Sequence, residues 1–406
     1  MNNKTTPIII IGIIGFVILT YFLSPAGPGS CDNKITITEL PPEERQNGVQ
    51  FITDHFKAPE EFIGEQFDSH DIIFLGEFGM PNYTVFGFRE NVSLVKKVIP
   101  ILLKKGIYLL AIEHLLAEDQ EEIDKITSAR EFDEPGAKRL ISRRAPLFLF
   151  QDYVDLIRDV WTVNRGKSAG DPLFRIIGLN MKLNYVTLLQ AQEAKELGKA
   201  FDGMVQEDFI FSVIDREIIG KKKKALVFVN MLYAIKKDIL ADRHIFYKDM
   251  ELDYSGSPAK LTIDKVGDRA MVMLQHNLWV RNDQTLGFPI EGYFDALLRE
   301  LPGRVQETAF FVKGSPFENL TITTAFIMPG TKPVFFSDIC DAYILQGQLN
   351  YYTVPQMFTD TINEENMGQI KAMLQLPDEK SKTLEDITAE VRNLETVNSF
   401  MSSLPK

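Results

Sequence analysis

Short, nearly continuous apolar runs recur along most of this chain and are separated by more polar segments. Such runs are typical of β-strands that are buried on both faces, as in a parallel sheet. The runs that we expect to form strands are 72–75, 107–113, 174–179, 225–230, 270–277 and 306–312, with a further run at 341–345 that is expected to close the sheet.

The segments between these runs are longer and carry apolar residues at helical spacing. We expect helices at 85–105, 115–128, 147–165, 185–219 and 292–301. Pro100 is expected to kink the last turn of the first helix. This alternation predicts an α/β fold with a largely parallel, mixed central sheet, covered by helices on both faces and carrying helical insertions.

An uncharged apolar segment lies near the start of the chain, at residues 7–23, and follows Lys4. Its length is at the short end of the range for a membrane-spanning helix. We interpret residues 1–24 as an uncleaved signal anchor, a single-pass transmembrane helix with a cytoplasmic N-terminus and an extracytoplasmic main domain. Cleavage after Ser30 and lipidation of Cys31 are the alternatives.

The rest of the chain reads as one domain between two polar segments. Residues 25–48 are rich in Pro, Gly and Glu and predict a tether, residues 49–360 a single α/β domain, and residues 361–406 a polar helical tail. The net charge of −12 argues against nucleic acid as a partner, because no basic field would attract phosphates. The two cysteines, Cys31 and Cys340, match neither a disulfide framework nor a zinc spacing.

Polar side chains end several of the expected strands. The residues at these ends are Glu77, Glu113, Asn180, Asn230, His276 and Asn277. Because the carboxyl ends of parallel strands share one edge of a sheet, this edge is where we expect a site. Arg89, on the next helix, is expected to pair with Glu77, since a bidentate arginine satisfies a buried carboxylate. A purely structural ion-pair cluster of Glu77, Arg89 and Glu113 is the alternative.

The stretch DIIFLGEFGMPNYTVFGFR, residues 71–89, resembles the opening of the erythromycin-esterase-like proteins, which are similar to the haem-uptake (Tiki, ChaN-like) superfamily. Those proteins have an apolar strand with Gly-Glu-X-X-His, an arginine on the next helix and a second strand that ends in glutamate. Glu77, Arg89 and Glu113 match these positions, and Asn180 stands where the third strand usually carries a carboxylate. The resemblance implies that these three matching residues belong to a hydrolase-like catalytic set.

The first family histidine is missing, because Met80 stands in its place. In the esterases that histidine is the proposed general base, a role that a thioether cannot fill. His114 follows Glu113 directly and is expected to point to the opposite side of the strand. His70 precedes the first strand and is expected at its far end. Neither histidine is therefore expected to replace the missing base.

A second histidine signature of the family can be placed in two ways. In QHNLWV, residues 275–280, His276 and Asn277 are kept and Trp279 replaces the last histidine. In VNMLYA, residues 229–234, Tyr233 occupies the histidine position. The first placement is preferred, and it adds His276 to the catalytic set that the resemblance implies.

Four further residues are candidates for ligand binding around this set: Tyr83, Asn180, Asn277 and Trp279. No bound metal or other cofactor is predicted, because no close pair of histidines or cysteines supports one. Haem or a divalent metal is implied by the family resemblance alone.

These observations lead to three functional hypotheses. The first, which the missing histidines favour, is a membrane-anchored, degenerate hydrolase fold that binds a small ligand or an envelope protein, and the other two are alternatives to it. The second is an active hydrolase of an ester or related bond, in which Glu77 or Glu113 acts as general base and Arg89 holds the substrate. The third is a structural subunit of an envelope complex.

If residues 7–23 form an uncleaved anchor, the full chain should sediment with membranes and keep its first residues. Cell fractionation followed by N-terminal sequencing measures both properties. A soluble product that begins near Cys31 would contradict the anchor, and a lipid on Cys31 would replace it with a lipoprotein.

Overall fold

The computed structural model describes residues 37–77, 88–144, 149–237, 247–280, 286–322, 333–353, 355–373 and 383–393. In these ranges no helix combines the length and the apolar character that a membrane crossing requires. Residues 7–23, Met80 and Tyr83 lie outside the described residues, and so do the expectations that concern them.

A seven-stranded sheet forms the centre of the molecule, in the order β3-β2-β4-β1-β5-β9-β8. The strands are β1 (Ile72–Glu77), β2 (Leu109–Leu116), β3 (Arg175–Asn180), β4 (Ala225–Asn230), β5 (Ala270–Gln275), β8 (Glu307–Phe311) and β9 (Ala342–Gln346). All neighbours pair in parallel except β8, which runs antiparallel to β9. The predicted α/β class with a largely parallel, mixed sheet is confirmed.

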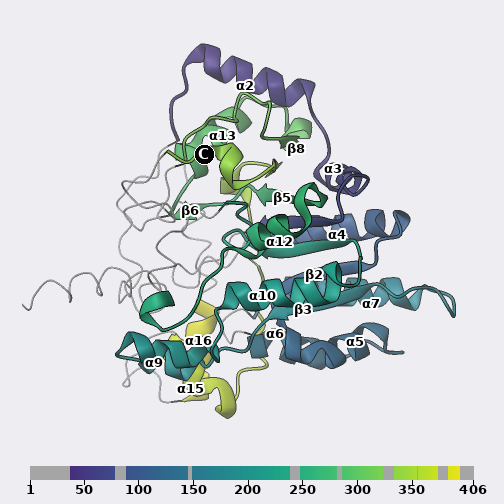
Figure 1. Ribbon diagram of the computed structural model, residues 1–406, viewed down its shortest axis with the longest axis vertical. Helices are drawn as coiled ribbons and strands as arrows, with labels where there is room; N and C mark the ends of the chain where they lie inside the picture. Colours follow the sequence, from purple (N-terminus) through teal and green to yellow (C-terminus); the bar gives the residue numbers. More distant parts are fainter. Residues whose placement is uncertain are drawn as a thin grey trace, which may run out of the picture.

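Helices cover both faces of this sheet (Figure 1). One apolar core includes α3 (Pro59–Gln66), α4 (Arg89–Lys104), α5 (Gln120–Ser128), α6 (Glu134–Arg144) and α7 (Gln151–Arg165). The other includes α2 (Pro42–Asp54), α10 (Gln206–Ile214), α12 (Pro258–Val266), α13 (Tyr293–Leu298) and α14 (Phe336–Ile339). The short helices α8 (Tyr185–Gln190) and α9 (Ala194–Gly198) add to the first core, together with α15 (Glu364–Met373) and α16 (Leu384–Asn393).

The two cores follow from the alternation of side chains along each strand. On β1, Ile73 and Leu75 belong to the α4 and α7 side, whereas Ile72 and Phe74 belong to the α10 and α12 side. Every residue of β1 is buried, which is why its sequence is continuously apolar up to Glu77. We call these two sides the α7 face and the α13 face.

Several element boundaries differ from the expectations. β8, and not the run at 341–345, forms the edge of the sheet, because β9 pairs with both β5 and β8. The helix α2 begins at Pro42, inside the segment predicted as a tether. It is anchored by the buried Ile52 and by a close contact of Gly48 with Leu297. The region 115–128 is not one helix, because β2 continues to Leu116 and α5 begins at Gln120.

The strand β2 is irregular where it approaches its end. It pairs regularly with β3 as far as Ile112 with Gly178, and the next pair is Leu116 with Asn180. From one pair to the next, β2 advances by four residues and β3 by two. The extra residues of β2 form a bulge. At Gly178 an added Cβ would lie 2.4 Å from the carbonyl oxygen of Leu116, so the bulge requires a residue without a side chain there.

Gly178→Ala should therefore destabilise the fold by about 1–3 kcal/mol, because the obstructing atom belongs to the backbone and cannot rotate away. Gly303→Ala is the matched control, since no atom lies within 4 Å of the added Cβ, and it should change the free energy of unfolding by less than about 0.5 kcal/mol. Denaturant titration measures both. Equal stabilities of the two variants would contradict this account of the bulge.

Candidate functional site

The carboxyl ends of the parallel strands meet at one edge of the sheet, as expected. Glu77, the last residue of β1, pairs in register with Asn230, the last residue of β4. Glu113 lies in the bulge of β2, and Asn180 ends the neighbouring strand β3. All four polar residues are thereby placed along the same edge, with β1 and β4 at its centre.

Glu77 is almost completely buried, with 2% of its surface exposed. Its Oε1 accepts a hydrogen bond from the hydroxyl of Tyr153 on α7 and lies 3.5 Å from Nδ1 of His114. Burial raises the pKa of Glu77 well above its ordinary value of 4.5, the charge of Glu113 raises it further, and the hydrogen bond from Tyr153 only partly offsets these effects. This carboxyl therefore holds a proton more tightly than an exposed glutamate.

Glu113 is also buried at this edge, and its carboxylate has both a backbone N–H and an arginine as partners. Its Oε2 accepts the backbone N–H of Asn230 at 2.6 Å, and its Oε1 lies 3.7 Å from Nη2 of Arg144, the last residue of α6. The Nε of Arg144 also donates to the backbone carbonyl of Glu113 at 3.2 Å. Burial raises the pKa of Glu113, whereas Arg144 and the backbone N–H lower it.

His114 belongs to the same cluster, a place beside Glu77 that the sequence did not predict. Its ring stacks on that of Tyr153, with centroids 4.0 Å apart and an interplanar angle of 21°. The alternation of side chains along β2 explains this placement, because Leu110 and Ile112 belong to the α7 face and His114 is the next residue on that side. Burial, and then the charge of Arg144, lower the pKa of His114 well below 6.5. The imidazole is therefore neutral at neutral pH.

His70 lies where the sequence predicted, before β1 and away from this edge. Its Nδ1 is 2.9 Å from the backbone carbonyl of Gln66 at the end of α3. Its own carbonyl accepts a hydrogen bond from Nζ of Lys224, which precedes β4. His114 is thus the imidazole that the described part of the chain places beside Glu77.

A chain of amides supports the bulge from the α13 face. Asn180 donates from Nδ2 to the backbone carbonyl of Glu113 at 3.1 Å, and its Oδ1 accepts from Nε2 of Gln206 at 2.5 Å. The hydroxyl of Tyr233 donates to Oε1 of Gln206 at 2.9 Å. Asn180, a ligand candidate from the sequence, is therefore engaged in fixing the backbone of Glu113.

Sequence reasoning missed Tyr153, Arg144 and Gln206. Tyr153 lies on the apolar stripe of the helix expected at 147–165, and a buried tyrosine hydroxyl needs a partner, so a signal for it existed. No pattern points to Arg144, because no helix is expected at 134–144. Gln206 contacts Asn180 across 26 residues, a pairing that only the folded chain defines.

The expected pair of Arg89 with Glu77 is wrong. The Nε of Arg89 donates to Oδ1 of Asp152 at 3.0 Å, and 52% of the arginine side chain is exposed. Arg89 is the first residue of α4, and its backbone N–H is held by the carbonyl of Thr353. The side chain is thus directed to the start of α7, whereas the carboxyl of Glu77 meets Tyr153 one residue further along.

His276, Asn277 and Trp279 follow β5 and do not join the Glu77 cluster. His276 is fully buried, with Nδ1 2.9 Å from the hydroxyl of Tyr343 and Nε2 3.3 Å from Oδ1 of Asp295. Those partners lie on the α13 face, whereas Tyr153 lies on the α7 face. His276 therefore forms a separate buried cluster.

Asn277 and Trp279 are buried beside that cluster. The Oδ1 of Asn277 accepts from Nδ2 of Asn91 at 2.8 Å, and its Nδ2 donates to the carbonyl of Gln275. Trp279 lies in β6 (Trp279–Val280), which forms a hairpin with β7 (Leu286–Gly287), and 2% of it is exposed. Their roles in ligand binding stay predictions.

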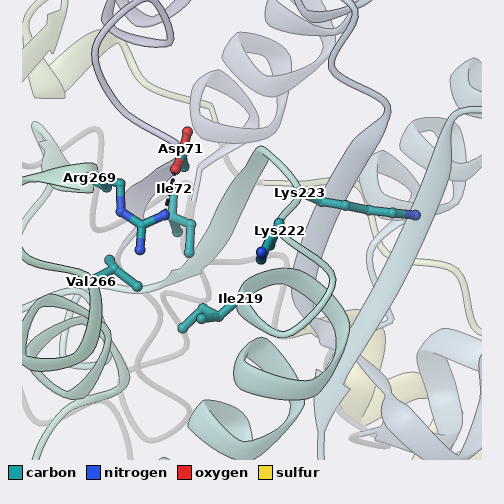
Figure 2. A pocket seen from close by; sticks show the side chains of 7 residues that line it. All are labelled: Asp71, Ile72, Ile219, Lys222, Lys223, Val266 and Arg269. Carbon is teal, nitrogen blue, oxygen red and sulfur yellow. Dashed lines mark hydrogen bonds and ion pairs between the residues drawn. The ribbon is translucent and has the colours of Figure 1, made fainter.

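A cavity of about 200 Å³ lies at the opposite edge of the sheet, where β1, β4 and β5 begin (Figure 2). Its lining residues are Asp71, Ile72, Ile219, Lys222, Lys223, Val266 and Arg269. Arg269 pairs with Asp71 at 3.1 Å, and Figure 2 shows Lys223 extending away from the other side chains. Lys222 and Lys223 are exposed where the chain enters the buried strand β4.

Within the described ranges, no three histidine, cysteine or carboxylate side chains are arranged to hold a metal ion. Glu77, Glu113 and His114 are instead bound to Tyr153, Asn230 and Arg144. The cluster is thus built from proton donors and acceptors.

These features define a largely parallel α/β protein with a buried cluster of titratable groups at the carboxyl edge of its sheet. No protein-family model matches the chain, and no curated protein matches it in sequence. Its structure is similar to that of a protein from Bacillus cereus, with a TM-score of 0.51 and 10% identity over 77% of this chain and 99% of that chain. It is also similar to a succinoglycan biosynthesis protein, with a TM-score of 0.51 and 8% identity over 75% and 97%.

A third solved structure, the haem-binding ChaN of Campylobacter jejuni, aligns over 53% of this chain and 86% of its own with a TM-score of 0.32 and 12% identity. That value is too low to support an argument. The first two similarities, at identities of 10% and below, show that the fold is shared.

The raised pKa of Glu77 has a consequence for stability that Glu77→Gln tests. The folded protein binds the Glu77 proton more tightly than the unfolded chain does. The contribution of Glu77 to the free energy of unfolding is therefore fully present below pH 4.5 and is lost as the pH rises through the folded pKa. Glutamine cannot titrate and still accepts the hydrogen bond from Tyr153. The variant should gain stability over the wild type from pH 4.5 upward, by at most about 1.4 kcal/mol per pH unit. Denaturant unfolding at several pH values measures this, and parallel curves would contradict it.

Proposed function

We propose that this domain is a hydrolase of an ester or related carbonyl bond, with His114 as the general base and protonated Glu77 as a hydrogen-bond donor. The observation that carries the proposal is the opposite displacement of two neighbouring pKa values, raised for Glu77 and lowered for His114, across 3.5 Å. Pairs of titratable groups whose pKa values are pushed apart by their surroundings are typical of acid and base roles in catalysis.

The roles follow from the protonation states. Neutral His114 has one unprotonated nitrogen and accepts a proton from water as the water oxygen adds to the carbonyl carbon. The tetrahedral intermediate then breaks its bond to the leaving oxygen, and the proton returns from the imidazole to that oxygen. Protonated Glu77 acts as a hydrogen-bond donor in this scheme, and Tyr153 holds its carboxyl in place.

Glu113 and Arg144 fix the strand that carries His114. Arg144 contacts both the carboxylate and the backbone carbonyl of Glu113, so the bulge of β2 is held from two sides. A general base must be placed within hydrogen-bonding reach of its proton, which makes this support part of the proposed function. His114 would then supply the imidazole that is missing at Met80 in the resemblance to erythromycin-esterase-like proteins.

The fold shared with the Bacillus cereus protein supports this proposal only at the level of architecture, because one fold hosts many activities. Attachment to a membrane through residues 7–23, with the domain on the extracytoplasmic side, remains part of the proposal.

A second candidate is a domain that binds a small ligand or an envelope protein without turnover. The observation that favours it is the depth of the cluster, since Tyr153 is 1% and Glu77 2% exposed. A site that is closed in this way suits binding or structural roles as well as catalysis.

The decisive experiment is hydrolysis of phenyl acetate, p-nitrophenyl butyrate and macrolide lactones by the full chain across pH. His114→Asn should lower kcat by about 10²–10⁴-fold, the usual contribution of a general base. The matched control is His55→Asn, because His55 is exposed at the end of α2 and should leave the rate unchanged. Equal activity of the two variants would contradict the role of His114.

The pH profile separates the roles of the two groups. Activity should rise as His114 loses its proton, below pH 6.5, and fall at higher pH as Glu77 loses its own, above pH 4.5. In Glu77→Gln the fall at high pH should disappear while part of the activity is kept. Complete loss of activity in that variant would instead favour Glu77 as the base. Absence of hydrolysis in the wild type would favour the binding domain.

A further inference from the structure

Two buried side-chain atoms at the carboxyl edge lack a hydrogen-bond partner within the described residues: Oε2 of Glu77 and Nε2 of Gln275. Both side chains are 2% exposed. Buried polar atoms are nearly always paired, so each unpaired one requires an explanation. One partner common to the two atoms would explain both, since they belong to adjacent strands.

The register of the sheet places these two side chains opposite each other. β1 and β5 are parallel neighbours and pair as far as Gly76 with Leu274, so Glu77 and Gln275 are the next residues on each strand. Leu75 and Met273, two residues earlier, both belong to the core of the α7 face. Side chains two residues apart share a face, so Glu77 and Gln275 also lie on that face.

Each of these two side chains ends in one paired atom and one unpaired atom. The partner of the paired atom shows where the unpaired atom points. Oε1 of Gln275 accepts from Nε2 of Gln346 at 2.8 Å, and Gln346 ends β9, on the side of β5 away from β1. The two arms of a planar amide diverge, so Nε2 of Gln275 is directed away from β9. Oε1 of Glu77 faces Tyr153 and His114, the latter on β2, so Oε2 is directed away from β2 and toward β5.

We infer that Oε2 of Glu77 and Nε2 of Gln275 form a two-donor site that binds the carbonyl oxygen of a ligand. Gln275 supplies an N–H. Glu77 supplies an O–H, because its Oε1 accepts the hydroxyl of Tyr153 and the carboxyl proton is left on Oε2. The inference rests on the proposed function and names the group of the substrate that the site holds.

The raised pKa of Glu77 supports this assignment, since an ionised carboxylate would be an acceptor and would repel a carbonyl oxygen. Two convergent donors in a buried site stabilise the negative charge that develops on that oxygen during hydrolysis, and removing one such donor typically lowers kcat by about 10²–10³-fold. The ligand class is therefore a neutral carbonyl compound, an ester or its amide analogue.

The test uses two variants of Gln275 and two readouts. Gln275→Met and Gln275→Leu both remove the donor and differ in side-chain shape, so the effect of the lost N–H can be told from an effect of packing. Gln46→Met, an exposed position on α2, is the matched control. The first readout is kcat and KM for phenyl acetate. The second is the ¹³C resonance of carbonyl-labelled acetanilide, an amide analogue that the protein is not expected to hydrolyse, added to the full chain.

We expect the wild type and Gln46→Met to shift the carbonyl resonance downfield, and both Gln275 variants to abolish the shift. For phenyl acetate, the Gln275 variants should lower kcat by about 10²–10³-fold with KM little changed. Unfolding curves show whether each variant is folded. If one Gln275 variant is not folded, the other one tests the two-donor site.

Failure of the inference differs from failure of the proposed function. Wild-type kcat and an unchanged acetanilide shift in the folded Gln275 variants would overturn the two-donor site while leaving hydrolysis intact. No hydrolysis by the wild type, together with a shift that depends on Gln275, would support the site and overturn the hydrolase. No shift with the wild type would overturn the site.

Discussion

The burial of the Glu77 carboxyl at the end of the central strand is the constraint on which the rest of the site depends. A carboxyl in an apolar interior is costly to ionise, so it must be neutral or well partnered. Here the hydroxyl of Tyr153 and the ring of His114 surround Oε1, and burial keeps the proton on the acid. The helix α7 must therefore pack with Tyr153 over the end of β1. This contact joins residues 76 positions apart in the chain.

The irregular end of β2 is the second feature on which the site depends. In a regular strand Glu113 and His114 would face opposite sides of the sheet. His114 follows Leu110 and Ile112 on the α7 face and meets Glu77 there, while Glu113 accepts the backbone N–H of Asn230 on the neighbouring strand. Arg144 and Asn180 hold the carbonyl of Glu113 and so fix the irregular backbone.

The two faces of the sheet separate two buried polar clusters. Glu77, His114 and Tyr153 lie with α7, whereas His276 meets Tyr343 and Asp295 among the aromatic residues of the α13 face. Glu77 and His276 stand at the ends of adjacent strands, but their side chains lie on opposite faces of the sheet and belong to separate clusters. The same architecture occurs in proteins of unrelated sequence, which is why the chemistry has to be argued from the side chains and not from the fold.

The sequence by itself determined the α/β class, the strands and the edge at which polar residues collect. Apolar runs, strand-end carboxylates and the rule for parallel sheets are local or topological signals, and they led directly to Glu77, Glu113 and Asn180. Only the tertiary structure decided which side chains meet. Arg89 pairs with Asp152 because the start of α4 lies beside α7. Arg144 and Tyr153 reach the site from α6 and α7, and the spacing of apolar residues in the sequence does not indicate where those helices pack on the sheet. His114 faces Glu77 because β1 and β2 lie in one sheet and both residues fall on its α7 face, which the order of strands decides and the local sequence does not.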